Sequence, residues 1–198
     1  KPYFYFDKNG TAKGAIPEIL KRISEDLNIE IEIVKSNSPT ESRQLISEGK
    51  VDFVVDAVCD YGHSSLYNIK PTQPYFALEY APVRRKDYEE HNPIVACVAE
   101  LIYTKSYIEQ RYPKDKIMYF STLEECFEAV NDGRADILFV PRSEVPYYIE
   151  ETDSYNLEIT SKSYFEDEIS FGVYAYSDPR LWQILNNEIN HLSEQFIR

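Results

Sequence analysis

The sequence has little of several features that mark specialised proteins. Its 198 residues hold three cysteines, one methionine, one tryptophan and six glycines. The longest uncharged apolar run, Ile94–Ala99, is far shorter than the roughly 20 residues of a membrane-spanning helix, so no segment is expected to cross a bilayer. No Cys-x-x-Cys pair occurs, which argues against a zinc or redox site. Cys59 follows Ala57 and Val58, and Cys97 lies between Ala96 and Val98, so we expect the three cysteines, Cys126 included, to be buried thiols that act as small hydrophobes.

Positive charge is also scarce. Lys and Arg number 21 against 34 Asp and Glu, for a formal charge of −13. Nucleic acids and anionic bilayers would repel such a chain, so neither is expected as a partner, and a membrane would be reached only through a tether outside these residues. The sequence opens at Lys1 without a signal peptide, and we expect it to be a processed piece of a longer protein.

Catalytic motifs are missing as well. The sequence has no Gly-x-Ser-x-Gly elbow, no P-loop and no dinucleotide-binding glycine pattern. His63, Ser64 and Ser65 follow Asp60, but adjacent residues seldom form a catalytic triad. The three histidines are scattered without metal-ligand spacing. The sequence therefore predicts a domain that is not an enzyme, with no catalytic residues, no metal and no cofactor.

The sequence does contain a steady alternation of strand and helix patterns. Hydrophobic residues make up 43% of it, enough for a packed core. A helical pattern runs from Ile16 to Leu27, and Ile29–Ile33 then alternates isoleucine with glutamate, as a half-buried strand does. Other strands are expected at Tyr3–Phe6, Val51–Cys59, Tyr75–Arg84, Pro93–Ala99, Lys116–Phe120, Ala135–Val140 and Glu168–Tyr176. This order predicts an α/β fold with right-handed crossovers.

One pattern occurs twice. Residues 49–52 (Gly-Lys-Val-Asp) resemble residues 133–136 (Gly-Arg-Ala-Asp), and each run follows a helix pattern and opens a buried strand. The second of these helices starts at a capping-box pattern formed by Ser121 and Glu124. A common helix-to-strand link could recur by chance. The matching helices before the two runs favour two similar α/β lobes, each with its own sheet.

Several short motifs follow one another in a characteristic order. They are the aromatic run 2–6 with Gly10 and Gly14, the two glycine runs, residues 74–76 (Pro-Tyr-Phe), residues 171–174 (Phe-Gly-Val-Tyr) and residues 178–181 (Asp-Pro-Arg-Leu). In this order the chain resembles the bacterial extracellular solute-binding proteins of family 3 over residues 2–198. The resemblance implies a two-lobed, periplasmic-binding-protein-like (type II) fold, in which each lobe is a mixed, mostly parallel sheet flanked by helices. Lobe 1 would comprise residues 1–84 plus 164–198 and lobe 2 residues 88–160, with hinges near 84–88 and 160–164.

The departures from that family concern the ligand. Where amino-acid-binding members hold the ligand carboxylate with an arginine, this chain has Ser64 or Ser65. Glu100 stands at the start of a lobe 2 helix, where a carboxylate competes with an anionic ligand for the same N–H donors. Pro141, followed by Arg142, replaces the Asp that receives the ligand ammonium. Without these anchors we expect no tight binding of free amino acids, and a cationic or neutral small molecule is favoured.

The candidate ligand-binding residues lie where the resemblance places the cleft. Asp56 and Asp60 follow a buried strand, and a buried acid needs a partner, either a cationic ligand group or Arg142. An internal ion pair or a surface position is the alternative. Aromatic residues beside strands or hinges are expected as cleft walls. The full set of candidates is Tyr5, Asp56, Asp60, Tyr75, Glu100, Arg142 and Tyr164.

Sensor members of the family share the loss of these anchors, and the Thr-x-Pro-Tyr form at residues 72–75 is common among them. The sequence thus predicts an extracytoplasmic sensor domain of a membrane-anchored histidine kinase or diguanylate cyclase, which responds to a small molecule by lobe closure. The alternative is the soluble receptor of an ABC importer for a small polar solute that is not a standard amino acid. A homodimer of the parent protein is left open, as is an enzyme on the same fold that uses Asp56 or Glu100 for proton transfer.

Overall fold

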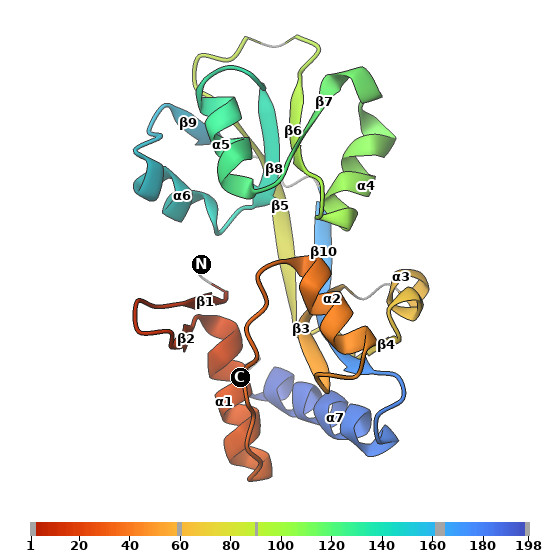
Figure 1. Ribbon diagram of the computed structural model, residues 1–198. Coiled ribbons are helices and arrows are strands. Elements are labelled where there is room, and N and C mark those ends of the chain that lie inside the picture. Colours follow the sequence, from red (N-terminus) through yellow and green to blue (C-terminus); the bar gives the residue numbers. More distant parts are fainter. Residues whose placement is uncertain (1–2, 59–60, 90, 161–164, 197–198) are drawn as a thin grey trace. The chain divides into compact units, whose positions relative to one another are not determined.

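Figure 1 shows the computed structural model, which describes residues 3–58, 61–89, 91–160 and 165–196. The chain divides into two compact units: unit 1 consists of residues 1–77 and 167–198, and unit 2 of residues 78–166. Each unit has a hydrophobic core of its own. Of the predicted residues, Cys59, Asp60 and Tyr164 lie outside the described ranges.

Unit 1 begins with a short hairpin that leads into a long helix. The carboxylate of Asp7 closes the hairpin turn, because its Oδ1 accepts hydrogen bonds from the backbone N–H groups of Asn9 and Thr11, both at 2.9 Å. Strand β10 pairs antiparallel with both β3 and β4. The elements in chain order are β1 (Tyr5–Phe6), β2 (Ala12–Lys13), α1 (Ala15–Leu27), α2 (Pro39–Ser47), β3 (Phe53–Val58), α3 (Tyr61–Leu66), β4 (Ile69–Pro71), most of β10 (Phe165–Tyr174) and α7 (Pro179–Phe196).

The core of unit 1 forms where α1, β10 and α7 meet. Ile16, Leu20 and Ile23 recur at helical spacing, so they lie on one face of α1, and all three are buried. The helical pattern predicted from Ile16 to Leu27 is confirmed, because α1 covers Ala15–Leu27. The other buried members of this core are Phe171, Val173, Leu185, Ile189 and Leu192.

The prediction of a strand at Ile29–Ile33 is wrong. This segment has no regular structure and pairs with no other strand of the described chain. In Figure 1 it runs back from the end of α1 as a coil. Alternating apolar and acidic residues meet the side-chain requirement of a strand, but a strand also needs a neighbour for its backbone N–H and C=O groups.

Unit 2 is built on a mixed sheet. Strand β6 pairs in parallel with β7 and β8, whereas β5 pairs antiparallel with β8 and β9. The elements are most of β5 (Phe76–Arg85), β6 (Val95–Val98), α4 (Ile102–Arg111), the 3-10 helix η1 (Lys114–Lys116), β7 (Ile117–Phe120), α5 (Leu123–Asn131), β8 (Ile137–Pro141), α6 (Val145–Thr152) and β9 (Leu157–Ile159). The parallel pairing expected in both lobes occurs only here among the described pairs, because β10 runs opposite to its neighbours in unit 1.

Helix α5 begins one residue later than the pattern of Ser121 and Glu124 indicated. Thr122 is the N-cap, and its hydroxyl accepts a hydrogen bond from the Glu125 N–H at 3.2 Å. The Glu125 carboxylate accepts in return from the Thr122 N–H at 3.3 Å and from the Ser121 N–H at 2.8 Å. Of the two overlapping Ser/Thr-x-x-Glu patterns, this one satisfies three backbone donors at the helix start.

The repeated glycine run forms the same link in each unit. Gly49 after α2 and Gly133 after α5 have φ angles of 67° and 78°, the left-handed region that glycine enters without a steric penalty. Their N–H groups donate back to the carbonyls of Ile46, at 2.9 Å, and Val130, at 3.2 Å. The helix, glycine and strand order read from the sequence is confirmed at both positions.

The two described cysteines are expected to resist alkylation. Cys97 and Cys126 are buried and free, and burial raises the pKa of Cys97 to about 11 and that of Cys126 to about 12. Since the thiolate is the reactive form, iodoacetamide at pH 8 should label neither residue in the native protein and both in denaturant. Peptide mapping by mass spectrometry measures this residue by residue. Native labelling as fast as that of a small free thiol would contradict the burial.

Gly172 on β10 is expected to tolerate no larger residue. A Cβ atom there would lie 2.6 Å from Ile69 Cγ2 and 2.8 Å from Ala57 Cβ. Gly172→Ala should therefore destabilise unit 1 by about 1–3 kcal/mol. Urea unfolding followed by the fluorescence of Trp182, the only tryptophan, measures the loss. The loss should shrink in an Ile69→Ala background, and equal losses in both backgrounds would show that this contact is not the cause.

Candidate functional site

A groove of about 810 Å³ runs along β3 in unit 1. One wall consists of residues 29–36 and the other of residues 50–56, while residues 4–6 and helix α1 contribute further lining. We call it the β3 groove. It brings together two of the predicted ligand-binding residues, Tyr5 and Asp56. Tyr5 is half-buried in β1, and Asp56 lies near the C-terminal end of β3.

Asp56 carries the chemically most distinctive group in the β3 groove. Its side chain is open to solvent, but protein atoms around the carboxyl desolvate it and so raise its pKa. The positive charge of Arg43 and a backbone hydrogen bond lower the pKa, and they do not outweigh the desolvation. A negative charge at Asp56 is thus only partly compensated within the protein. A cation placed beside it would be stabilised, and an anion would be repelled.

Arg43 and Ser42 belong to this site although the sequence did not single them out. Both come from α2: Ser42 lines the β3 groove, and the half-buried Arg43 has its guanidinium 5.7 Å from the centre of the Tyr67 ring. The link of helix, glycine and strand in the sequence could have pointed to both residues. It places α2 directly before β3, so polar residues on α2 are natural neighbours of the acid on that strand.

Tyr75 lies against the core of unit 1. Its ring stacks on Phe171, with 4.6 Å between ring centroids, and its hydroxyl donates a hydrogen bond to the Val55 carbonyl. Burial raises the pKa of the Tyr75 hydroxyl, and the nearby charge of Asp56 adds to this effect. Tyr75 therefore supports the strand that carries Asp56, with its hydroxyl already bonded to that strand.

The remaining described candidates, Glu100 and Arg142, belong to unit 2. Glu100 is exposed in the turn before α4, whose N-cap, Leu101, provides no side-chain hydrogen bond. The half-buried Arg142 follows β8, and its Nη2 donates to the Thr160 carbonyl at 3.3 Å. The lining of the β3 groove includes neither residue.

The described residues lack two features that would point to other functions. They contain no group of three or more His, Cys, Asp and Glu residues placed to hold a metal ion. None of their helices is both long and apolar enough to pass through a membrane.

Known proteins resemble the chain over nearly its whole length. The model of the bacterial extracellular solute-binding proteins, family 3, matches residues 1–195. No match was found among curated proteins.

Among solved structures, a histidine kinase sensor domain with similarity to periplasmic binding proteins has a TM-score of 0.84 at 19% identity, covering 98% of this chain and 86% of that one. A His/Glu/Gln/Arg/opine family-binding protein from Silicibacter pomeroyi, in complex with lysine, has a TM-score of 0.81 at 21% identity and covers 99% and 88%. Arginine-bound ArgBP from T. maritima, as a Gly52Ala mutant, has a TM-score of 0.77 at 18% identity and covers 96% and 90%. At such identities the likeness establishes the periplasmic-binding-protein-like fold.

Proposed function

The chain belongs to the bacterial extracellular solute-binding proteins of family 3, and from this we propose that it is the extracytoplasmic sensor domain of a membrane-anchored signalling protein. The parent protein would be a histidine kinase or a diguanylate cyclase. The observation that carries the proposal is the partly compensated carboxylate of Asp56 in the β3 groove. The likeness to a histidine kinase sensor domain, with a TM-score of 0.84, supports it.

Signalling would proceed through lobe closure. The proposed lobes are residues 1–84 plus 164–198 and residues 88–160, with hinges near 84–88 and 160–164. A ligand that binds the closed arrangement more tightly shifts the population toward it, and a following membrane helix would transmit that shift. The division of the chain into two compact units, with changes of unit at residues 77–78 and 166–167, supports two bodies joined by two connections.

The ligand we propose is a small cationic or neutral molecule. A cationic group would complete the charge balance of Asp56, while a free carboxylate would meet that acid without the arginine that amino-acid-binding relatives use. Ser64 or Ser65 stands at the place of that arginine; Ser64 is buried and Ser65 is exposed in α3, and neither carries a positive charge that could bind a carboxylate. Glu100, Arg142 and Tyr164 are proposed as further contacts from the second lobe and the hinge.

A second function is supported by other solved neighbours. Arginine-bound and lysine-bound binding proteins share the fold. Both ligands are standard amino acids, and it is their cationic side chain, not their α-amino-acid group, that agrees with the ligand proposed for this chain. The chain would then be the soluble receptor of an importer for a small polar solute other than a standard amino acid.

The coding sequence on either side of these residues tests the choice between the two functions. For a sensor we expect a membrane-spanning helix after Arg198, followed by a kinase or cyclase domain. In the parent protein, ligand addition should then change kinase or cyclase activity in membrane preparations. A lipoprotein leader before Lys1 together with a stop codon directly after Arg198 would contradict the sensor proposal and support the soluble receptor.

A further inference from the structure

Strand β3 contains a β-bulge at the residue that carries the acid. It lies beside β10 in unit 1 (Figure 1), and the register of this antiparallel pair shifts between Ala57↔Ser170 and Val54↔Gly172. Val55 and Asp56 therefore stand opposite a single residue of β10, Phe171, and this count of two against one defines a bulge. A bulge interrupts the hydrogen-bonded ladder, so the backbone groups at Val55 and Asp56 need partners from elsewhere.

The bulge changes the direction of the side chains on β3. In a regular strand, residues three positions apart point to opposite faces of the sheet. Val54 and Ala57 instead lie on the same face, because a Cβ atom at Gly172 would be 3.0 Å from Val54 Cγ2 and 2.8 Å from Ala57 Cβ. The bulge thus takes Asp56 out of the alternation of β3, and it determines where the carboxyl lies.

Tyr75 supplies the bulge with a hydrogen bond. Its hydroxyl donates to the carbonyl of Val55, the first of the two bulged residues. Its ring stacks on Phe171, the residue opposite the bulge, with 4.6 Å between the ring centroids. Phe171 is fully buried. One side chain therefore contacts both strands at the bulge, β10 through its ring and β3 through its hydroxyl.

The segment before Tyr75 is itself held firmly. The Thr72 N–H donates to the Phe171 carbonyl at 2.8 Å, and the Phe171 N–H donates to the Thr72 hydroxyl at 3.1 Å. The Gln73 N–H donates to Asn186 Oδ1 on α7 at 2.8 Å. Tyr75 therefore reaches the bulge from a segment that both β10 and α7 fix in place, as a group that positions another residue must be.

Tyr75 influences Asp56 through geometry and not through charge. Burial raises the pKa of the Tyr75 hydroxyl, so the side chain is neutral at ordinary pH. Arg43 on α2 lowers the pKa of Asp56, although desolvation outweighs this effect. The other charged side chains that line the β3 groove are Glu30, Glu32, Lys35, Lys50 and Asp52. What Tyr75 adds is the hydrogen bond that holds the backbone next to the acid.

We infer that Tyr75 is a positioning residue for Asp56: its hydroxyl, bonded to Val55, maintains the bulge that holds the carboxyl in a partly desolvated position at the β3 groove. The inference rests on the proposed role of Asp56 in binding a cationic ligand. A carboxylate that water stabilises less gains more from a cation beside it. Tyr75 thus contributes to the affinity for a cation by acting through β3.

A titration of the Asp56 carboxyl carbon by nuclear magnetic resonance, in the ligand-free protein, tests the inference. In Tyr75→Phe the Val55 carbonyl loses its donor, so the bulge should relax and water should reach the carboxyl. The raised pKa of Asp56 should then fall by at least about 0.5, toward the ordinary aspartate value. Tyr88→Phe is the matched control, because it also removes a hydrogen bond from a tyrosine hydroxyl to a carbonyl, that of His91 at 3.2 Å, but in unit 2. An Asp56 pKa that stays or rises in Tyr75→Phe, or that falls equally in both variants, would overturn the inference.

The chain with Tyr75 intact provides a second test, which is decisive even if Tyr75→Phe does not fold. Ionisation of Asp56 should shift the Cζ resonance of Tyr75 with an inflection at the pKa of Asp56, and Asp56→Asn should abolish this inflection. A Tyr75 resonance without the inflection would overturn the inference. Neither titration uses a ligand. A flanking coding sequence that contradicts the sensor proposal would therefore leave both results standing.

Discussion

Replacing Asp56 with asparagine is expected to weaken the binding of a cationic ligand by about 10- to 100-fold, because it removes the charge that the ligand would neutralise. The expected loss of affinity is small for a charged contact, because the Asp56 side chain is open to solvent. Isothermal titration calorimetry with the tightest cationic compound of a screen measures the change. Asp52→Asn is the matched control, because Asp52 lines the same groove and is also exposed. A similar loss in both variants would point to a general charge effect.

The affinity for a cationic ligand should depend on pH through the ionisation of the Asp56 carboxyl. The pKa of Asp56 is raised in the free protein, and a cation prefers the ionised form, so binding should release a proton. Affinity should therefore rise with pH up to the raised pKa of Asp56 and level off above it. In Asp56→Asn the affinity should not change over this window, provided that the ligand itself keeps its charge. A wild-type affinity that falls as pH rises would contradict the role of Asp56.

The thermal stability of the ligand-free protein tests the raised pKa of Asp56 without any ligand. Because the folded protein holds the Asp56 proton to a higher pH than the unfolded chain, Asp56 lowers stability as pH rises from the ordinary aspartate pKa of about 4 to its raised value. Above this window Asp56→Asn should melt at a higher temperature than wild type, and below it the two should melt together. A variant that melts lower at neutral pH would mean that Arg43 fully compensates the charge.

Replacing Phe171 with alanine is expected to lower the stability of unit 1 by about 3–5 kcal/mol, the cost of a large cavity in a packed core. Phe171 is fully buried and joins the rings of Tyr75 and Phe53, with 4.6 and 5.6 Å between centroids. Since Tyr75 in turn bonds to Val55 next to Asp56, the cavity should also loosen the strand that carries the acid. Urea unfolding followed by Trp182 fluorescence measures the loss in unit 1.

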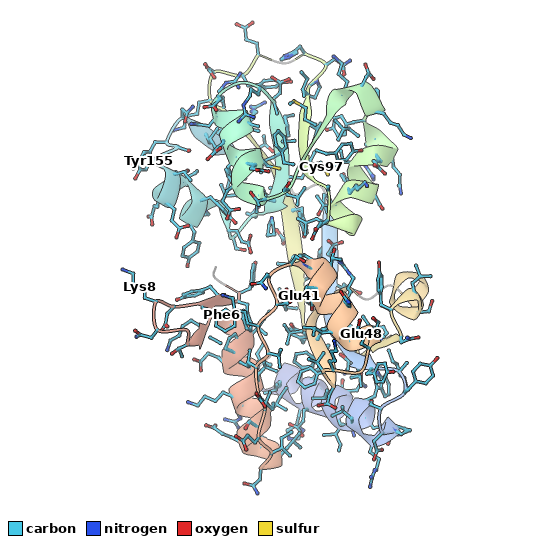
Figure 2. The ribbon with its side chains drawn as sticks, in the orientation of Figure 1. Phe6, Lys8, Glu41, Glu48, Cys97 and Tyr155 are labelled. Carbon is cyan, nitrogen blue, oxygen red and sulfur yellow. The ribbon has the colours of Figure 1, made fainter. Side chains whose placement is uncertain are left out.

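The control for Phe171→Ala is Tyr155→Ala. Tyr155, labelled in Figure 2, is 59% exposed, so its removal should change stability by less than about 0.5 kcal/mol. A Phe171→Ala loss below about 1 kcal/mol would mean that the core around β10 can collapse into the space, contrary to the close packing of its rings.

Local patterns predicted the fold wherever a segment's structure depends on its own residues. The spacing of Ile16, Leu20 and Ile23 predicted α1, and the two glycine runs predicted a helix end followed by a strand, which the structure has at both positions. The pattern at Ile29–Ile33 failed because pairing is decided by another segment, and no neighbour lies beside it among the described residues. The shift of the capping box to Thr122 has a similar cause, since only the folded turn shows how many N–H donors Glu125 can reach.

The sequence predicted part of the candidate site. Asp56 stood out because an acid at the end of an apolar strand needs a partner, and its raised pKa follows from that position. Arg43 was missed because it comes from a helix that only the fold brings near. Tyr75 carried a strong motif, yet its ring and hydroxyl are used by unit 1 itself. The sequence therefore singled out Asp56, whereas its desolvation and the nearby charge of Arg43, which determine its pKa, are evident only in the structure.

We propose that this member of the family binds a cationic or neutral small molecule and not a free α-amino acid. Isothermal titration calorimetry of the purified protein against the standard amino acids and a panel of small cationic and neutral solutes tests it most directly. We expect saturable binding by a member of the panel, weakened in Asp56→Asn, and no micromolar affinity for any standard amino acid. Micromolar binding of a standard amino acid would contradict it.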